Sequence, residues 1–140
     1  MKYLIINPFG IGDVLFTTPL INAIKEAQPQ SIISYWCNER VKDIFKNDPQ
    51  IDKVFALSRG DLKRIYGRSR IEAIKLFFRL FLGLKRQKFD VCFDFSLDHR
   101  YGFFTKIAGI KRRIGFNYKK RGRFLTDRIE STGFRDTHVV

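Results

Sequence analysis

The feature that most constrains this chain is a regular alternation of strand-like and helix-like segments. Apolar, β-branched and aromatic residues predict six short strands, at 2–7, 31–37, 51–57, 89–95, 112–116 and 124–129. Apolar residues at helical spacing fill most of the intervals, at 14–28, 40–47, 71–88 and 100–110. This alternation predicts an α/β fold, a Rossmann-like parallel sheet with helices on both faces.

The length fits one domain. A chain of 140 residues lies within the usual ~100–200 residues per domain, so we expect residues 1–140 to form a single unit. The hydrophobic content of 44% is enough for a core and argues against disorder. The last residues, 138–140, are apolar and carry no terminating signal. We therefore expect this domain to be truncated from a longer protein.

The excess of positive charge lies in one part of the sequence. The 27 Lys and Arg against 14 Asp and Glu give a net charge of +13. Residues 1–58 hold equal numbers of basic and acidic side chains, so the whole excess falls in residues 59–140. Such an asymmetry predicts an anionic partner, which could be a phosphate, a nucleic acid or an acidic membrane surface. Charge alone does not distinguish among them.

The cysteines and the apolar segments indicate the compartment. Cys37 and Cys92 stand inside apolar runs, which predicts buried, reduced thiols and neither a disulfide framework nor a metal site. No secretory signal opens the chain. The most apolar stretch, 71–84, is interrupted by charges and falls short of the ~20 apolar residues of a membrane span. We expect a cytoplasmic protein, at most peripheral on a membrane.

A loop with two glycines follows the first strand. Gly10-Ile11-Gly12-Asp13 departs from the dinucleotide-binding fingerprint, because Leu15 stands where a third small residue is needed. The glycines allow positive φ angles or the close approach of a ligand. Spacing alone favours Asp13 as a helix N-cap over Asp13 as a general base. Pro19 predicts either a kink or a second helix start capped by Thr18.

Residues 5–20, IINPFGIGDVLFTTPL, resemble the opening of glycosyltransferase family 9, the bacterial heptosyltransferases of lipopolysaccharide core assembly. In that family an apolar strand is followed by G-x-G-D-x-x-x-x-x-P. Further segments resemble the family in the same order along the chain, at 47–54, 89–94, 108–116 and 138–139. Because the matches are collinear and span nearly the whole chain, the resemblance is more specific than the loop alone.

The resemblance implies the N-terminal, acceptor-binding domain of a two-domain GT-B enzyme. It implies that Asp13 is the base that deprotonates the acceptor hydroxyl for an inverting attack on the donor sugar, without a metal. The donor, expected to be ADP-heptose, would bind a C-terminal domain that these residues do not include. No cofactor is therefore expected here, and the chain alone should transfer little or no sugar. The implied acceptor is an anionic glycolipid of the lipid A-Kdo type at the inner-membrane surface.

Basic residues cluster in two connections, 58–70 and 117–123, both of which we expect to be loops at the carboxyl ends of strands. Ligands gather at that edge of a parallel sheet. Phosphates and carboxylates of the acceptor are therefore predicted to bind Gly10, Gly12, Arg59, Lys63, Arg64, Lys120, Arg121 and Arg123. For any single arginine a solvated surface position is the alternative. For the whole chain the alternative is a non-catalytic basic domain that binds nucleic acid or anionic lipid, although no motif for specific nucleic-acid recognition is present.

Three further features carry structural expectations. Arg112 and Arg113 open a strand and are predicted to be structural or to face a membrane surface. Asp94 is predicted to be satisfied by the N-terminus of the following helix. The helix at 71–88 has only a narrow polar stripe. We expect it to be buried on more than one side, with partial insertion into a membrane interface as the alternative.

Overall fold

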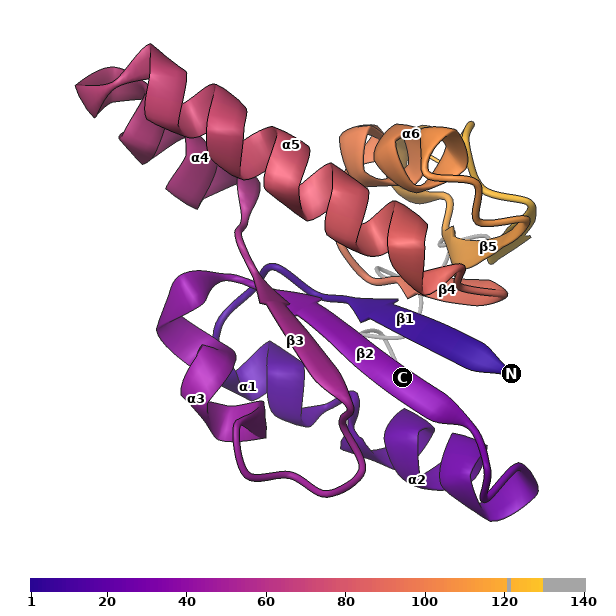
Figure 1. The fold of residues 1–140 in the computed structure, drawn as a ribbon. Coiled ribbons are helices and arrows are strands. Elements are labelled where there is room, and N and C mark those ends of the chain that lie inside the picture. Colours follow the sequence, from indigo (N-terminus) through magenta and orange to yellow (C-terminus); the bar gives the residue numbers. More distant parts are fainter. Residues whose placement is uncertain (121, 130–140) are drawn as a thin grey trace, which may run out of the picture.

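The computed structural model describes residues 1–120 and 122–129, which form a six-stranded parallel sheet between two layers of helices (Figure 1). The strands are β1 (Lys2–Ile6), β2 (Ile32–Cys37), β3 (Lys53–Ala56), β4 (Val91–Asp94), β5 (Arg112–Phe116) and β6 (Asp127–Ile129). Their order is β3-β2-β1-β4-β5-β6, and every neighbouring pair is parallel. The predicted α/β class and Rossmann-like sheet are confirmed.

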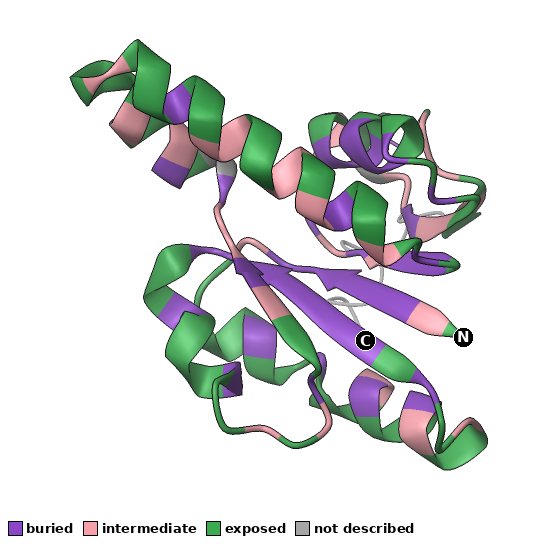
Figure 2. Cartoon of the chain, viewed as in Figure 1, coloured by how far each residue is buried: buried purple, intermediate pink, exposed green. Residues whose placement is uncertain are grey.

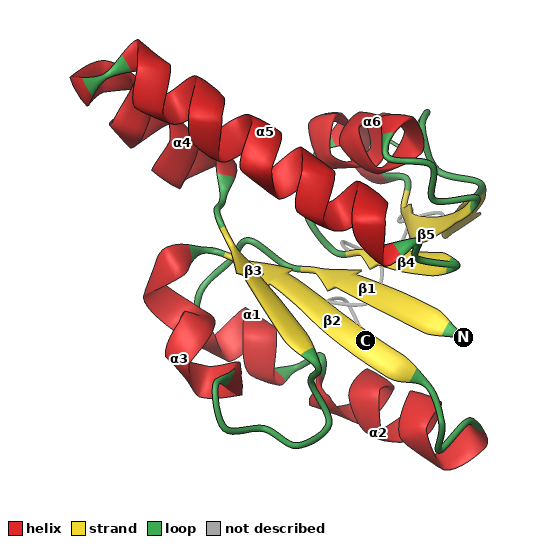
Figure 3. Ribbon diagram, viewed as in Figure 1, coloured by secondary structure: helices red, strands yellow, loops and turns green. Residues whose placement is uncertain are grey.

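Helices cover both faces of the sheet, as Figure 3 shows. One layer contains α1 (Ile11–Leu15), α2 (Thr18–Ala27), the short 3-10 helix η1 (Glu39–Val41) and α3 (Lys42–Phe45). The other contains α4 (Arg59–Arg68), α5 (Arg70–Gln87) and α6 (His99–Ile107). The helices α4 and α5 pack against each other, and their outer part extends past the edge of the sheet (Figure 1).

Alternation along the strands divides the core into two clusters. On β1, Tyr3 and Ile5 belong to the cluster under α1, α2 and α3, whereas Leu4 and Ile6 belong to the cluster under α5 and α6. The strands β1, β2 and β4 are buried along most of their length, whereas β3, β5 and β6 are more exposed (Figure 2). Trp36 lies in the second cluster, with its ring centroid 4.8 Å from that of Tyr101. Both faces of the sheet are therefore in the interior, as a parallel sheet requires.

The first helix is broken in two. The backbone of Gly10 caps α1, so Asp13 lies inside this helix and the prediction of Asp13 as its N-cap is wrong. The second helix starts separately, with Thr17 at its N-cap position and Pro19 in its first turn, one residue earlier than predicted. At the corner the buried Thr17 hydroxyl donates to the Val14 carbonyl at 2.6 Å and lies 2.8 Å from the Tyr35 hydroxyl. These contacts fix the break.

The connection 58–70 is helical, which corrects the prediction of a loop. Ser58 and Asp61 form a capping box: the Ser58 hydroxyl accepts from the Asp61 amide, and the Asp61 carboxylate accepts from the Ser58 amide. The segment is mostly polar, but both the Ser-x-x-Asp pattern and the helical spacing of Leu62, Ile65 and Tyr66 were available signals. The segment 117–123 contains a 3-10 turn, η2 (Tyr118–Lys120).

Arg112 and Arg113 have structural roles, as one alternative predicted. The Arg113 guanidinium donates to the carbonyls of Ile110 and Phe124, each at 2.6 Å. Arg112 forms an ion pair with Asp127 of β6 at 2.8 Å. Gly115 lies so close to β4 that an added Cβ would stand 2.7 Å from the Asp94 carbonyl oxygen. The Arg-Ile-Gly segment therefore joins β5 to both its neighbours.

The long helix α5 is buried on some sides only. Phe77, Leu80 and Phe81 pack against the core, and Ala73 is buried near α4. A stripe of large apolar side chains on the same helix is exposed, namely Ile71, Ile74, Phe78 and Leu82. The expected burial is thus incomplete within the described structure. In the described part of the chain, no helix has both the length and the apolar character needed to cross a membrane.

Both cysteines are buried free thiols, as predicted. Burial raises the pKa of Cys37 to about 12 and the pKa of Cys92 well above its ordinary value. Within residues 1–120 and 122–129, no cluster of His, Cys, Asp and Glu side chains is arranged to hold a metal ion.

Candidate functional site

A polar cleft of about 630 Å³ opens at the carboxyl edge of the sheet. The strand order reverses between β1 and β4, and the segments that follow these two strands meet here. In open α/β sheets, ligands bind at such a switch point. The cleft is lined by residues from four segments. They include Pro8 and Phe9 after β1, Asn38 and Arg40 after β2, Ser58, Asp61, Lys63 and Arg64 around the start of α4, and Ser96 and Asp98 after β4.

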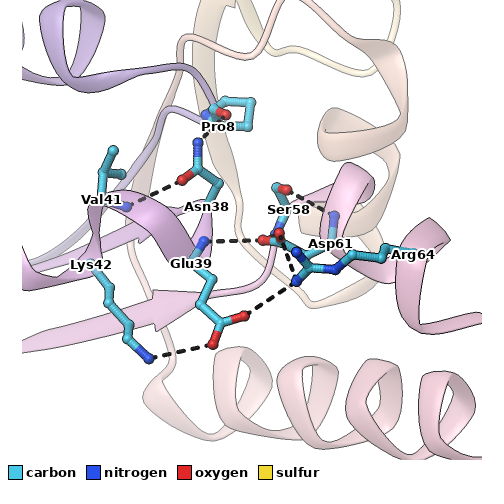
Figure 4. A network of polar contacts seen from close by, with 8 residues as sticks. All are labelled: Pro8, Asn38, Glu39, Val41, Lys42, Ser58, Asp61 and Arg64. Atoms are coloured by element: carbon cyan, nitrogen blue, oxygen red, sulfur yellow. Dashed lines mark hydrogen bonds and ion pairs between the residues drawn. The ribbon is translucent and has the colours of Figure 1, made fainter.

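Two buried asparagines hold the loop that follows β1. The Asn7 amide group donates to the Asp13 carbonyl at 3.1 Å, and its carbonyl oxygen accepts from the Phe9 amide at 3.2 Å. Asn38 donates to the Pro8 carbonyl at 3.0 Å (Figure 4) and also to the Phe9 carbonyl at 3.0 Å. Both asparagines are only 3% exposed. The path of this loop is therefore fixed from two sides.

Asp61 ties the start of α4 to the loop after β2. Its Oδ2 atom accepts from the Ser58 amide at 2.9 Å and from the Glu39 amide at 3.0 Å (Figure 4). Burial by itself raises the pKa of this carboxyl, but the two amide hydrogen bonds and the Arg64 charge outweigh it and hold the pKa below its usual value. Asp61 is thus a charged structural group within the cleft wall.

The predicted cations of α4 differ in their surroundings. Arg64 is engaged, because its Nη2 atom lies 3.6 Å from Glu39 Oε2 and 3.7 Å from Asp61 Oδ1. Lys63 and Arg40 line the same cleft and are exposed, and neither makes an ion pair within the described residues. Arg59 is the first residue of α4. Arg40 was missed from the sequence, although its position directly after a strand was a usable signal.

The second predicted cluster is not brought to this cleft. Lys120 and Arg123 are exposed but are absent from its lining, and Arg121 lies outside the described residues, as do residues 138–139. The guanidinium of Arg123 lies 5.0 Å from the centre of the Phe124 ring. The physical reason is strand order: this loop follows β5, which is one strand further from the reversal than β4.

Asp13, Gly10 and Gly12 are absent from the lining of the cleft; they follow Pro8 and Phe9, which do line it, in the same loop and helix. Asp13 is exposed, and its carboxylate makes no hydrogen bond or ion pair with any residue in the described ranges. Gly10 has a φ of −75°, so the positive φ allowed for in the sequence is not used there. A Cβ added at Gly10 or Gly12 would meet nothing within 4 Å. The space above both glycines is therefore open.

Comparison with known proteins identifies relatives by sequence. No family model matches the chain. Over 65 residues the chain is 34% identical to lipopolysaccharide heptosyltransferase 1 of Campylobacter coli, a match that covers 46% of this chain and 19% of the relative. The chain thus matches about a fifth of that relative's length.

Solved structures that resemble this chain are also heptosyltransferases or members of glycosyl transferase family 9. The E. coli heptosyltransferase WaaC with ADP-2-deoxy-2-fluoro heptose superposes with a TM-score of 0.77 and 16% identity, over 93% of this chain and 42% of that one. E. coli ADP-heptose lps heptosyltransferase II superposes with a TM-score of 0.70 and 20% identity, over 91% of this chain and 34% of that one. A glycosyl transferase family 9 protein of Veillonella parvula superposes with a TM-score of 0.70 and 18% identity, over 91% of this chain and 35% of that one.

This chain covers less than half of each of these solved structures. At such identities the structural likeness concerns the fold, which is a heptosyltransferase-like Rossmann fold of the GT-B type. The sequence relative and the structural neighbours together confirm the resemblance of this chain to the heptosyltransferases of glycosyltransferase family 9.

Proposed function

We propose that this chain is the acceptor-binding part of a heptosyltransferase that moves heptose, with inversion, from ADP-heptose to the lipopolysaccharide inner core. The observation that carries the proposal is the cleft at the β1/β4 reversal, built by the same loop that holds the family-like motif. Because the chain covers less than half of its relatives, the donor site is assigned to a further domain.

In this proposal Asp13 is the general base. Its carboxylate is exposed and unengaged among the described residues, so it is available to a bound hydroxyl. Asp13 takes the proton of the acceptor hydroxyl while the hydroxyl oxygen forms a bond to the anomeric carbon of the donor. The bond from that carbon to the nucleotide phosphate breaks on the opposite face, and ADP leaves with the electron pair. Open space at Gly10 and Gly12 supports close approach of the acceptor.

The acceptor is proposed to be a glycolipid of the lipid A-Kdo type. Its phosphates and carboxylates suit the exposed cations Arg40 of η1 and Lys63 of α4, which both line the cleft. Arg64 would share its charge between acceptor and Glu39. Lys120, Arg121 and Arg123, like Arg59, are assigned to parts of this large acceptor that lie beyond the cleft.

The binding half of the proposal is tested by calorimetry with the deacylated, phosphorylated Kdo-glucosamine oligosaccharide. Lys63→Ala and Arg40→Ala should each weaken binding severalfold and reduce its dependence on salt. Lys46→Ala, an exposed cation at the end of α3 that does not line the cleft, serves as the matched control. Equal affinity in the unmodified protein and the three variants would exclude the cleft as the acceptor site.

The catalytic half is tested in the enzyme that pairs this chain with its donor-binding domain. Asp13→Ala should abolish heptose transfer and leave acceptor affinity unchanged, because the carboxylate acts on the proton and does not hold the sugar. Retained turnover would exclude Asp13 as the base. Robust transfer from ADP-heptose by residues 1–140 alone would contradict the assignment of the donor site to another domain.

A further inference from the structure

An apolar pocket of about 180 Å³ adjoins the polar cleft. Ser58 and Tyr101 line both cavities, so the pocket begins where the cleft ends. Its walls come from the aromatic residues Trp36, Phe77 and Phe104 and from the aliphatic residues Leu62 and Leu80. The Trp36 indole N–H donates to the Leu57 carbonyl at 2.6 Å, so the one polar atom of this ring is already satisfied. The pocket therefore suits a hydrocarbon group.

A second apolar pocket of about 220 Å³ lies between α4 and α5. It shares Leu62 and Phe77 with the first pocket, so the two are neighbours along the helix pair. At its far end stand Ile74 and Phe78, which are 52% and 57% exposed. An apolar track thus runs from the polar cleft to the exposed stripe of α5.

The charged residues that line this track are concentrated towards the cleft, although the Arg70 guanidinium lies 5.7 Å from the centre of the Tyr66 ring beside the second pocket. Arg40 and Lys63 line the cleft, and Arg100 lines the first pocket. The carboxylates nearby are committed to backbone amides: Asp61 accepts from Ser58 and Glu39, and Asp98 accepts from the Arg100 amide at 3.0 Å. The second pocket has no charged residue in its lining. A ligand that fits this pattern has an anionic head and an apolar tail.

From this arrangement we propose that the track holds one hydrocarbon chain of the glycolipid acceptor, with its anionic head in the cleft. The inference rests on the proposed function, since it assigns a lipid tail to the same acceptor. At roughly 30 Å³ for a water-sized group, the first pocket accommodates about six methylene groups, which are of similar size. The exposed stripe of α5 would lead the remaining chain towards the membrane surface.

The test uses n-alkyl phosphates of two to ten carbons, below the concentration at which they aggregate. Trp36 is the only tryptophan of the sequence and lines the first pocket, so its fluorescence reports occupancy. Affinity should rise about fourfold per methylene, equivalent to about 0.8 kcal/mol, until the first pocket is full. A terminal bromine on the hexyl chain should quench Trp36. Affinity that is independent of chain length would overturn the proposal.

Two variants test where the hydrocarbon chain of the ligand binds. Leu62→Phe adds bulk where the two pockets meet and should remove most of the chain-length dependence, while leaving the affinity for inorganic phosphate unchanged. Ile44→Phe, on α3 in the opposite layer, is the matched control and should behave like the unmodified protein. Leu82→Ser changes the exposed stripe outside both pockets. Loss of the chain-length dependence in Leu82→Ser but not in Leu62→Phe would overturn the proposal in favour of surface adsorption.

The outcome is separable from that of the proposed function. Binding of the deacylated oligosaccharide that does not increase when one acyl chain is restored would overturn the tail site and leave the acceptor cleft intact. Chain-length-dependent binding of alkyl phosphates without binding of the oligosaccharide would support the tail site and refute the heptosyltransferase acceptor.

Discussion

The buried carboxyl group of Asp94 should make the stability of the protein depend on pH in a defined direction. Asp94 ends β4, is 6% exposed, and accepts a hydrogen bond from the Ser96 amide at 2.8 Å. The prediction that the N-terminus of the following helix satisfies Asp94 is wrong. The helix α6 begins at His99 and is capped by Asp98, while Asp94 accepts from Ser96. Burial raises the pKa of Asp94 from 3.8 to about 6, more than the Ser96 hydrogen bonds lower it, and Asp98 adds to the increase.

The sign and size of the effect follow from linkage. Below pH 3.8 the Asp94 carboxyl is protonated in both the folded and the unfolded protein, so it does not lower the free energy of unfolding. As the pH rises to about 6 the unfolded protein ionises first, so stability is lost across this window. At 1.36 kcal/mol per pKa unit, the loss is about 3 kcal/mol. Asp94→Asn keeps an oxygen for the Ser96 amide and never ionises.

The free energies of unfolding of Asp94→Asn and the unmodified protein are compared by urea denaturation between pH 3 and 7, with Trp36 fluorescence as the signal. Relative to the unmodified protein, the variant should gain about 3 kcal/mol over this range. Asp52→Asn, an exposed carboxylate before β3, controls for the loss of one negative charge. A difference between Asp94→Asn and the unmodified protein that is constant with pH would refute the reasoning.

Three further outcomes are expected. Gly115→Ala should lower the free energy of unfolding by about 1–3 kcal/mol, because the new Cβ would overlap the carbonyl of the adjacent strand; an unchanged melting temperature would contradict the close packing. Cys37 and Cys92 should react with a thiol reagent at pH 8 only as fast as the protein unfolds, because burial raises the pKa of both; rapid labelling of the native protein would show that they are accessible. Phe78→Ser should weaken flotation with anionic vesicles about tenfold without loss of stability, since its side chain is exposed; Phe77→Ser, whose ring packs 5.1 Å from another in the core, should instead destabilise the protein.

Local patterns predicted most of the fold. The strand β5 was predicted with its observed bounds, although only Ile114 and Phe116 in it are large apolar residues. The helix α4 was missed because it is mostly polar, although a capping box and the helical spacing of Leu62, Ile65 and Tyr66 marked it. The break between α1 and α2 was one of the two alternatives that Pro19 predicted, but the buried contact of Thr17 with Tyr35 of β2 is contained in no local pattern.

The site was less accessible to prediction than the fold. Which loops meet depends on strand order, and alternation of strands and helices does not specify that order. The loop 8–13 and Lys63 were placed at the correct edge, whereas Lys120 and Arg123 follow a strand too far from the reversal. Asn38 and Asp61 were missed because their partners are backbone groups of other loops, which exist only in the folded chain.

The hydrogen bonds of Asn38 and Asp61 connect the loops after β1, β2 and β3 into one frame (Figure 4). Because this frame is closed by the protein's own groups, a ligand would find its walls already in place and would lose little affinity in ordering them. The exposed cations project from the frame without holding it together. In the proposed function, substitutions among these cations would change the affinity for an anionic acceptor while the shape of the cleft stays the same.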